Sequence, residues 1–144
     1  MNKLFTLLLL LAVAFGVQAQ NGIVGTWFNT TKSGKVEIVK KGDKFFGEIV
    51  WLEEPMDENT GKAKVDENNP DKSKRNAAII GLQVLKDFEY DGDGKYSGGT
   101  IYDPENGKTY KCKMTLVEDD KLDVRGYIGI PALGRTENWT RAVQ

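Results

Sequence analysis

The fold is decided by residues 83–128, QVLKDFEYDGDGKYSGGTIYDPENGKTYKCKMTLVEDDKLDVRGYI. This stretch contains four runs that are rich in β-branched and aromatic residues. The turns between them are made of Gly, Asn and Asp, which tolerate positive φ and suit short hairpins. We therefore expect strands near 83–90, 95–102, 107–117 and 120–128. Because short connections make consecutive strands antiparallel neighbours, the pattern predicts an up-and-down meander.

The same pattern extends to both sides of this stretch. Further strand-like runs lie near 23–29, 34–41, 44–52 and 135–142. A meander of eight strands can protect its edges by closing into a barrel. The sequence therefore predicts an all-β domain, a single antiparallel up-and-down β-barrel of about eight strands, over residues 20–144.

One connection is much longer than the others. Residues 53–75 are polar, and loops of this length are uncommon in compact domains and often functional. The apolar run 76–82 that follows is expected to form one short helix, starting near Asp71 or Ser73, that plugs one mouth of the barrel. Acidic spacing in the loop does not complete a calcium-binding pattern, so no metal site is predicted.

The N-terminus has the pattern of a secretory signal. Lys3 precedes the apolar run 4–15, and Val17-Gln18-Ala19 ends in small residues suited to cleavage. The run is too short to span a bilayer. We expect residues 1–19 to be a signal peptide and the mature chain to be exported, periplasmic or extracellular, with no transmembrane segment.

Charge and composition limit the functions available to the mature chain. Removing Lys3 leaves 19 of the 20 basic residues against 21 acidic ones, a net charge of −2. This balance, with no basic block along the chain, disfavours nucleic acid and anionic membrane surfaces as partners. The chain contains no histidine, which excludes Ser-His-Asp and Cys-His catalysis. No catalytic residue or cofactor is predicted, and an enzyme would need a set such as Arg125, Tyr127 and Glu137.

The single cysteine lies in an alternating run, Tyr110-Lys111-Cys112-Lys113-Met114. A period of two places Cys112 on one face with Tyr110 and Met114, opposite the two lysines. Free cysteines usually behave as core residues, so a buried, inert thiol is expected. The alternative is a reactive or intermolecular thiol, because an unpaired cysteine in an exported protein is unusual.

The last strand carries an alternating set of charged and aromatic side chains. Arg135, Glu137, Trp139 and Arg141 share one face. If Trp139 points inward, charged groups come close to the interior, where they must be paired or hold a ligand. Because most ion pairs and cation–π contacts are structural, a structural Arg–Glu and Arg–Trp network is favoured over a ligand anchor for this set. The candidate ligand-binding residues are Trp51, Tyr102, Arg125, Tyr127 and Trp139.

Both ends of the chain resemble known β-barrels. Gly25-Thr26-Trp27 opens the first strand and Trp139-Thr140-Arg141 closes the last, which resembles the lipocalin and fatty-acid-binding superfamily. The resemblance implies that Trp27 and Arg141 pack together and close one end of the barrel. The opening also resembles avidin-like biotin binders through Asn29 and Ser33, but this likeness ends within about ten residues, without that group's later tryptophans.

Nearly all of residues 20–144 resembles domain-of-unknown-function family 2147, a bacterial family. The matching segments are Ile23-Val24-Gly25-Thr26-Trp27, Gly47-Glu48-Ile49-Val50-Trp51-Leu52, 66–70, Gly98-Gly99-Thr100-Ile101-Tyr102-Asp103-Pro104, Gly107-Lys108-Thr109-Tyr110-Lys111-Cys112, Arg125-Gly126-Tyr127-Ile128-Gly129, Leu133-Gly134-Arg135-Thr136 and Trp139-Thr140-Arg141. The resemblance implies an exported, lipocalin-like barrel and supplies no activity or site residues.

Two functions fit a barrel of this size, which holds packed side chains or one small ligand. The first is binding of a small apolar or amphipathic molecule in the periplasm. The alternative is a filled barrel that serves as an envelope interaction or stress-accessory module, with an unknown protein partner engaged through the 53–75 loop or an exposed edge. Substitution of Arg125 or Tyr127 should weaken binding in the first case and mainly lower stability in the second.

Overall fold

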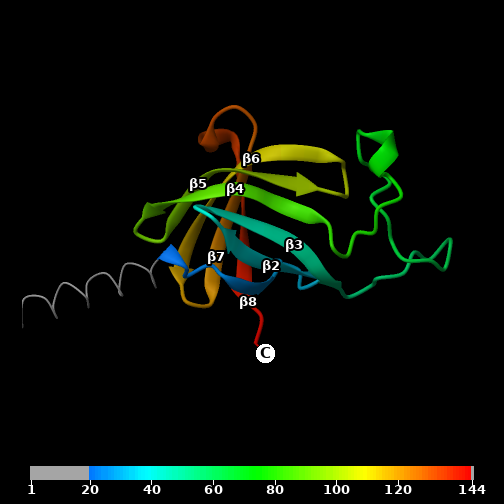
Figure 1. The fold of residues 1–144 in the computed structure, drawn as a ribbon, viewed down its shortest axis with the longest axis horizontal. Coiled ribbons are helices and arrows are strands. Elements are labelled where there is room, and N and C mark those ends of the chain that lie inside the picture. The colour runs from blue at the N-terminus through cyan, green and yellow to red at the C-terminus, as the bar shows by residue number, and fades with distance from the viewer. Residues whose placement is uncertain (1–19, 144) are drawn as a thin grey trace, which may run out of the picture.

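The computed structural model describes residues 20–143, so the predicted signal peptide lies outside the described residues. Eight strands follow one another along the chain (Figure 1), with two short 3₁₀ helices, η1 and η2. The strands are β1 (Gly25–Phe28), β2 (Gly34–Lys41), β3 (Lys44–Leu52), β4 (Gln83–Gly92), β5 (Lys95–Asp103), β6 (Lys108–Glu118), β7 (Lys121–Tyr127) and β8 (Arg135–Arg141). Each strand overlaps one of the eight that the sequence predicts.

The strands form a closed antiparallel barrel in chain order. Closure comes from β1 and β8, where Trp27 lies opposite Arg141 and Phe28 lies opposite Thr140. The predicted up-and-down topology is therefore confirmed. Because closure pairs the first strand with the last, the described barrel has no unpaired edge along its circuit.

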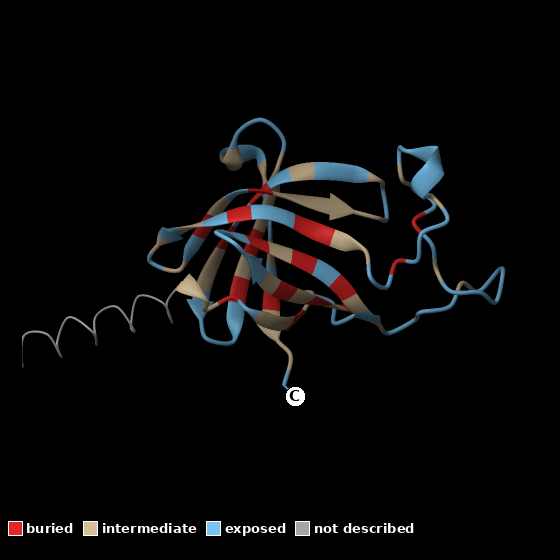
Figure 2. Cartoon of the chain, in the orientation of Figure 1, coloured by how far each residue is buried: buried red, intermediate tan, exposed pale blue. Residues whose placement is uncertain are grey.

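Alternation along the strands fills the interior with apolar side chains. The buried hydrophobic strand residues are Trp27, Val36, Ile38, Phe45, Ile49, Val84, Leu85, Phe88, Tyr96, Cys112, Met114, Leu122, Val124 and Trp139. In Figure 2 the buried positions appear as bands that alternate with exposed ones along the ribbon. Phe45 is buried while Phe46 is not, which settles which of the two apolar faces of β3 lies inside.

One end of the barrel is closed by the pair that the lipocalin resemblance implies. The Arg141 guanidinium lies 4.3 Å from the Trp27 ring centre. It donates hydrogen bonds to the carbonyls of Gly22 at 2.6 Å, Val24 at 3.0 Å and Asp119 at 2.7 Å. Gly25 has φ of +135°, and a Cβ there would lie 2.7 Å from Arg141 Nη1, so glycine leaves room for the arginine. We call this the closed end.

The prediction that residues 76–82 form a helical plug is wrong. Residues 76–82 form turns, and Ala78 makes an isolated antiparallel bridge with Val65. The short helix lies just before them, at η1 (Lys72–Lys74), where the Asp71 side chain accepts from the Ser73 amide. Gly81 donates to the Ile49 carbonyl and Ile49 donates to the Leu82 carbonyl, so these backbone groups are bonded to β3 instead of to a helix.

The long connection is held against the barrel by a buried carboxylate. Asp66 is fully buried, and it accepts hydrogen bonds from the Tyr102 hydroxyl at 2.7 Å and from the Asn69 amide at 2.8 Å. Asn68 donates to the carbonyls of Pro104 and Glu105 in the next loop. A Cβ at Gly107 would collide with the Asn68 carbonyl, so glycine is required for this docking.

Candidate functional site at the open end of the barrel

The end opposite Trp27 carries the connections 29–33, 53–82, 104–107 and 128–134. Here several inward-facing residues remain partly exposed, whereas those deeper in the barrel are buried. A Cβ at Gly126 would lie 3.4 Å from Ile101 Cγ2 and 3.5 Å from Tyr110 Cβ, so these side chains share its inner side. We define the mouth cluster as Ile101, Tyr110, Gly126 and Glu137.

Glu137 is the charged member of the mouth cluster. It alternates with the buried Trp139 on β8 and lies opposite the buried Val124 on β7, which places its side chain inside the barrel. Its Oε2 accepts the indole N–H of Trp139 at 3.2 Å. Across residues 20–143, no lysine or arginine pairs with this carboxylate. A partly buried carboxylate with one neutral donor retains capacity to accept further hydrogen bonds.

The Cys112 thiol lies in the interior, within electrostatic reach of Glu137. It is 1% exposed, which confirms the predicted burial. Burial, and secondarily the Glu137 carboxylate, raise the pKa of Cys112 to about 12. Since the thiolate is the nucleophile, the thiol is chemically inert near neutral pH.

Tyr110 brings a second polar group to the mouth. Its hydroxyl accepts a hydrogen bond from the Asn106 side chain at 3.0 Å, which ties the tyrosine to the 104–107 loop. Ile101 lies directly opposite Tyr110 on β5 and packs against the core. The mouth therefore combines an aliphatic wall, a phenol and a carboxylate, a set suited to a molecule with one apolar and one polar end.

The five residues predicted to bind a ligand do not converge on this cluster. Trp139 lies inside, directly below Glu137. Trp51 lies on the outer face, 37% exposed, with the Lys35 ammonium 4.9 Å from its ring and Phe28 in edge contact. Tyr102 alternates with Ile101 on β5, and its hydroxyl is used by Asp66.

Arg125 and Tyr127 also lie on the outer face, because they alternate with the buried Leu122 and Val124. The Arg125 guanidinium donates to the Pro131 carbonyl at 2.9 Å and to the Thr136 hydroxyl at 2.7 Å. These bonds hold the 128–134 loop in place. A ligand-binding role for Trp51, Tyr102, Arg125, Tyr127 and Trp139 stays a prediction.

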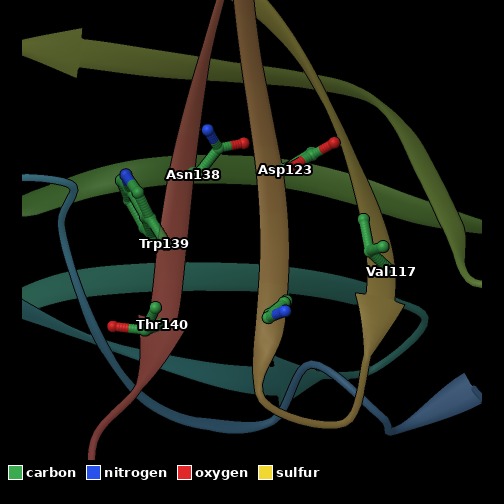
Figure 3. Close-up of a pocket in the computed structure, with 6 residues that line it drawn as sticks. Val117, Asp123, Asn138, Trp139 and Thr140 are labelled. Carbon is green, nitrogen blue, oxygen red and sulfur yellow. The ribbon is translucent and has the colours of Figure 1, made fainter.

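Two hollows occur on the outside of the described barrel. One, of about 320 Å³, lies over β6, β7 and β8 near the closed end, where Asp123 and Asn138 project side by side with Val117 beyond them (Figure 3). The other, of about 190 Å³, lies over β2 and β3 and includes Phe46 and Glu48.

In the described part of the chain no three acidic or cysteine side chains gather closely enough to hold a metal ion. Residues 20–143 include no helix with the length and apolar character needed to cross a membrane.

Comparison with known proteins assigns the chain to a family. The DUF2147 family model, which describes uncharacterized proteins conserved in bacteria, matches residues 25–141. This range covers the barrel from its first strand to its last. The chain belongs to the DUF2147 family. The resemblance read from the sequence is thereby confirmed, and the family description specifies no activity.

A solved structure shares the fold of this DUF2147 protein. It is protein HP1028 from the human pathogen Helicobacter pylori, a protein that belongs to the lipocalin family. The two chains are 27% identical, with a TM-score of 0.72 over 84% of this chain and 83% of that one. The lipocalin-like barrel is therefore shown. A search of curated proteins finds no match to this chain.

Sequence reasoning missed the roles of two residues. Asp66 looked like one of many carboxylates in a polar loop, and nothing in its neighbours signals that Tyr102, 36 positions away, covers it. Glu137 was placed on the Trp139 face but assigned to an Arg–Glu network, which the described residues do not form. The alternation that buries Trp139 was the available signal, because it places Glu137 inside as well.

Proposed function

We propose that this protein is exported and binds a small amphipathic molecule at the open end of its barrel, with the polar end of that molecule at Glu137. The observation that carries the proposal is the inward-facing Glu137 carboxylate, which accepts the Trp139 indole N–H at 3.2 Å. A carboxylate in a partly apolar setting is stabilised by donors. A hydroxyl or amine on a ligand would supply them.

The filled part of the barrel limits the depth of such a site. Trp139, Cys112, Met114 and Tyr96 occupy the interior below the mouth and are buried. A ligand would therefore reach only the upper layer, where Ile101 and Tyr110 offer apolar contact. This geometry favours a short or single-ring molecule over a long chain threaded through the barrel.

The filled interior also favours a second candidate function. A barrel packed with large side chains needs no guest for stability, and the hollows of about 320 and 190 Å³ lie on its outer face. The protein would then act as an interaction module of the cell envelope. The two functions differ in whether Glu137 contributes to binding.

Native mass spectrometry of the protein purified gently from its own cells tests the proposal. A one-to-one adduct that solvent extraction removes is expected for the protein, and a reduced adduct for Glu137→Gln. Glu48→Gln, an exposed carboxylate outside the barrel, is the matched control and should keep the adduct. A bare protein mass would favour the interaction module, and an adduct equally abundant in Glu137→Gln would contradict a role for Glu137 in binding.

A further inference from the structure

The loop between β7 and β8 presents large aliphatic side chains to solvent. Ile128 is 65% exposed, Ile130 58% and Leu133 76%. They lie within six consecutive residues, so they form one apolar tip, which we define as residues 128–133. Single exposed aliphatic residues are normal on a protein surface, but a contiguous group usually marks an interaction site. The loop projects from the barrel in Figure 1, and its tip is marked exposed in Figure 2.

The apolar tip is built in a fixed shape. Its 3₁₀ turn, η2 (Pro131–Leu133), is closed by backbone bonds from Leu133 to Ile130 and from Gly134 to Pro131, each 3.1 Å. From outside the turn, Arg125 donates to the Pro131 carbonyl at 2.9 Å. Because the backbone of the tip is already ordered, the tip would lose little conformational entropy on binding to another surface.

Basic side chains lie on one side of the base of the apolar tip. Lys111 lies opposite Tyr127, and Lys113 lies opposite Arg125, on the outer face of β6 and β7. Arg135, at the start of β8, is exposed but lies opposite the inward-facing Gly126, so it belongs to the other face of the sheet. Lys111, Lys113 and Arg125 are within two residues of the loop or of a residue that flanks it, roughly 7 Å along the strands. Strand pairing thus gathers charges that are dispersed in the sequence.

Within residues 20–143 none of these basic side chains forms an ion pair, although Asp123 lies two positions from Arg125 on the same face of β7. Lys113 and Arg125 are directly opposed like charges, an arrangement that destabilises a sheet. The ion pair recorded among residues 20–143 joins Lys121 to Glu118, toward the opposite end of the barrel. An unpaired basic group beside an apolar tip is complementary to a surface with negative headgroups above a hydrocarbon layer.

We propose that the apolar tip docks the protein on an anionic phospholipid bilayer. Ile128, Ile130 and Leu133 enter the interfacial layer, while Lys111 and Lys113 contact lipid phosphates. Tyr127, between the lysine row and the tip, lies at the headgroup level that aromatic side chains favour. The overall negative charge argued against such a surface, but the local distribution of charge determines this contact.

Vesicle sedimentation tests the docking surface. The full-length gene product is expressed in a bacterial host, and its N-terminus is determined by mass spectrometry. It is then mixed with vesicles of phosphatidylcholine containing phosphatidylglycerol, or of phosphatidylcholine alone. We expect sedimentation with the anionic vesicles that weakens as salt is added. Ile128→Ser/Leu133→Ser should lower the partition by about tenfold or more, and Lys111→Gln/Lys113→Gln should remove most of the preference for anionic lipid.

Val117→Ser is the matched control, since Val117 is also an exposed aliphatic residue (54%) but lies at the far end of β6. It should bind like the parent. All proteins share the same N-terminus, so any contribution of residues 1–19 cancels. Failure of the parent to bind anionic vesicles would overturn the proposal, as would equal binding by the tip variant. Self-association without lipid that the tip variant abolishes would instead assign the tip to a second copy of this chain.

Discussion

At the scale of single residues, Asp66 joins the long connection to the barrel. A buried carboxylate is tolerated where donors surround it, and here they come from Tyr102 on β5 and Asn69 in the loop itself. Burial and the Asp66 carboxylate raise the pKa of Tyr102 to about 12, so the phenol stays protonated and donates at physiological pH. The 53–82 connection is therefore an ordered part of the structure.

Tyr102→Phe removes this donor and leaves Asp66 Oδ1 without its partner. We expect the free energy of unfolding to fall by about 1–3 kcal/mol, the usual cost of an unsatisfied buried acceptor. Urea denaturation measures the change. Tyr127→Phe is the control, because the Tyr127 hydroxyl makes no hydrogen bond with the described residues, and it should change stability by under about 0.5 kcal/mol. Equal effects of both substitutions would show that the Asp66 contact contributes nothing.

Cys112 gives the barrel a defined response to alkaline pH. The folded protein raises the pKa of this thiol from 9.0 to about 12. Below pH 9 both states hold the proton, and as the pH rises the unfolded chain loses it first, so stability declines from pH 9 toward 12. Tyr96, whose pKa burial raises from 10.0 to about 12, adds to the decline above pH 10.

We therefore expect wild-type protein to lose stability between about pH 8 and about pH 10, and Cys112→Ala to lose less over the same interval. Urea titrations at the two pH values give the comparison. The thiol of the folded protein should also resist a disulfide reagent that labels it after denaturation. Parallel pH dependence in the two proteins, or rapid labelling of the native state, would show that the thiol is accessible.

At the scale of elements, the closed end depends on β1 and β8 together. Arg141 contacts the Trp27 ring and bonds to three carbonyls from two different segments. Replacing Arg141 with Met keeps much of the aliphatic stem but removes every hydrogen bond. The expected loss of stability is about 2–4 kcal/mol.

Arg135→Met is the matched control for Arg141→Met. Arg135 belongs to the same strand and face but is exposed and makes no ion pair within residues 20–143. Thermal unfolding should show a small change for Arg135→Met and a clear decrease for Arg141→Met. If both variants unfold at the parent temperature, Arg141 does not hold the closed end.

The strands were largely predictable because local signals agree with the tertiary fold. Gly, Asn and Asp at the hairpin turns and a period of two within each run predicted all eight strands with small errors at their ends. Residues 76–82 were mistaken for a helix because their apolar content suits either structure. Tertiary contacts decide against the helix, since the backbone groups of Gly81 and Leu82 form hydrogen bonds with Ile49 on β3.

The site was less predictable than the fold, because barrel faces and loop contacts depend on distant segments. Alternation alone separates Arg125 and Tyr127 from the inward-facing Leu122 and Val124, but it does not show which side of a β-strand lies inside. The apolar content of 128–133 was visible in the sequence. That Lys111 and Lys113 lie beside it became visible only from the pairing of β6 and β7.

At the scale of the whole molecule, the barrel has two different ends. The closed end is sealed by Trp27, Arg141 and the buried Ile23. The open end carries the mouth cluster, the ordered 53–82 connection and the apolar tip. A protein docked through the tip would hold the mouth near a bilayer surface, where an amphipathic molecule is concentrated. Ligand binding and docking nevertheless rest on different residues, so either can fail alone.

Backbone chemical-shift mapping tests the ligand site most directly. Isotope-labelled protein is titrated with a solvent extract of the cells from which it comes, and with the same solvent alone. We expect shifts to concentrate at Ile101, Tyr110, Gly126 and Glu137, and to weaken in Glu137→Gln. An absence of shifts with the extract, or shifts confined to the outer hollows or the closed end, would contradict a ligand site at the mouth of the barrel.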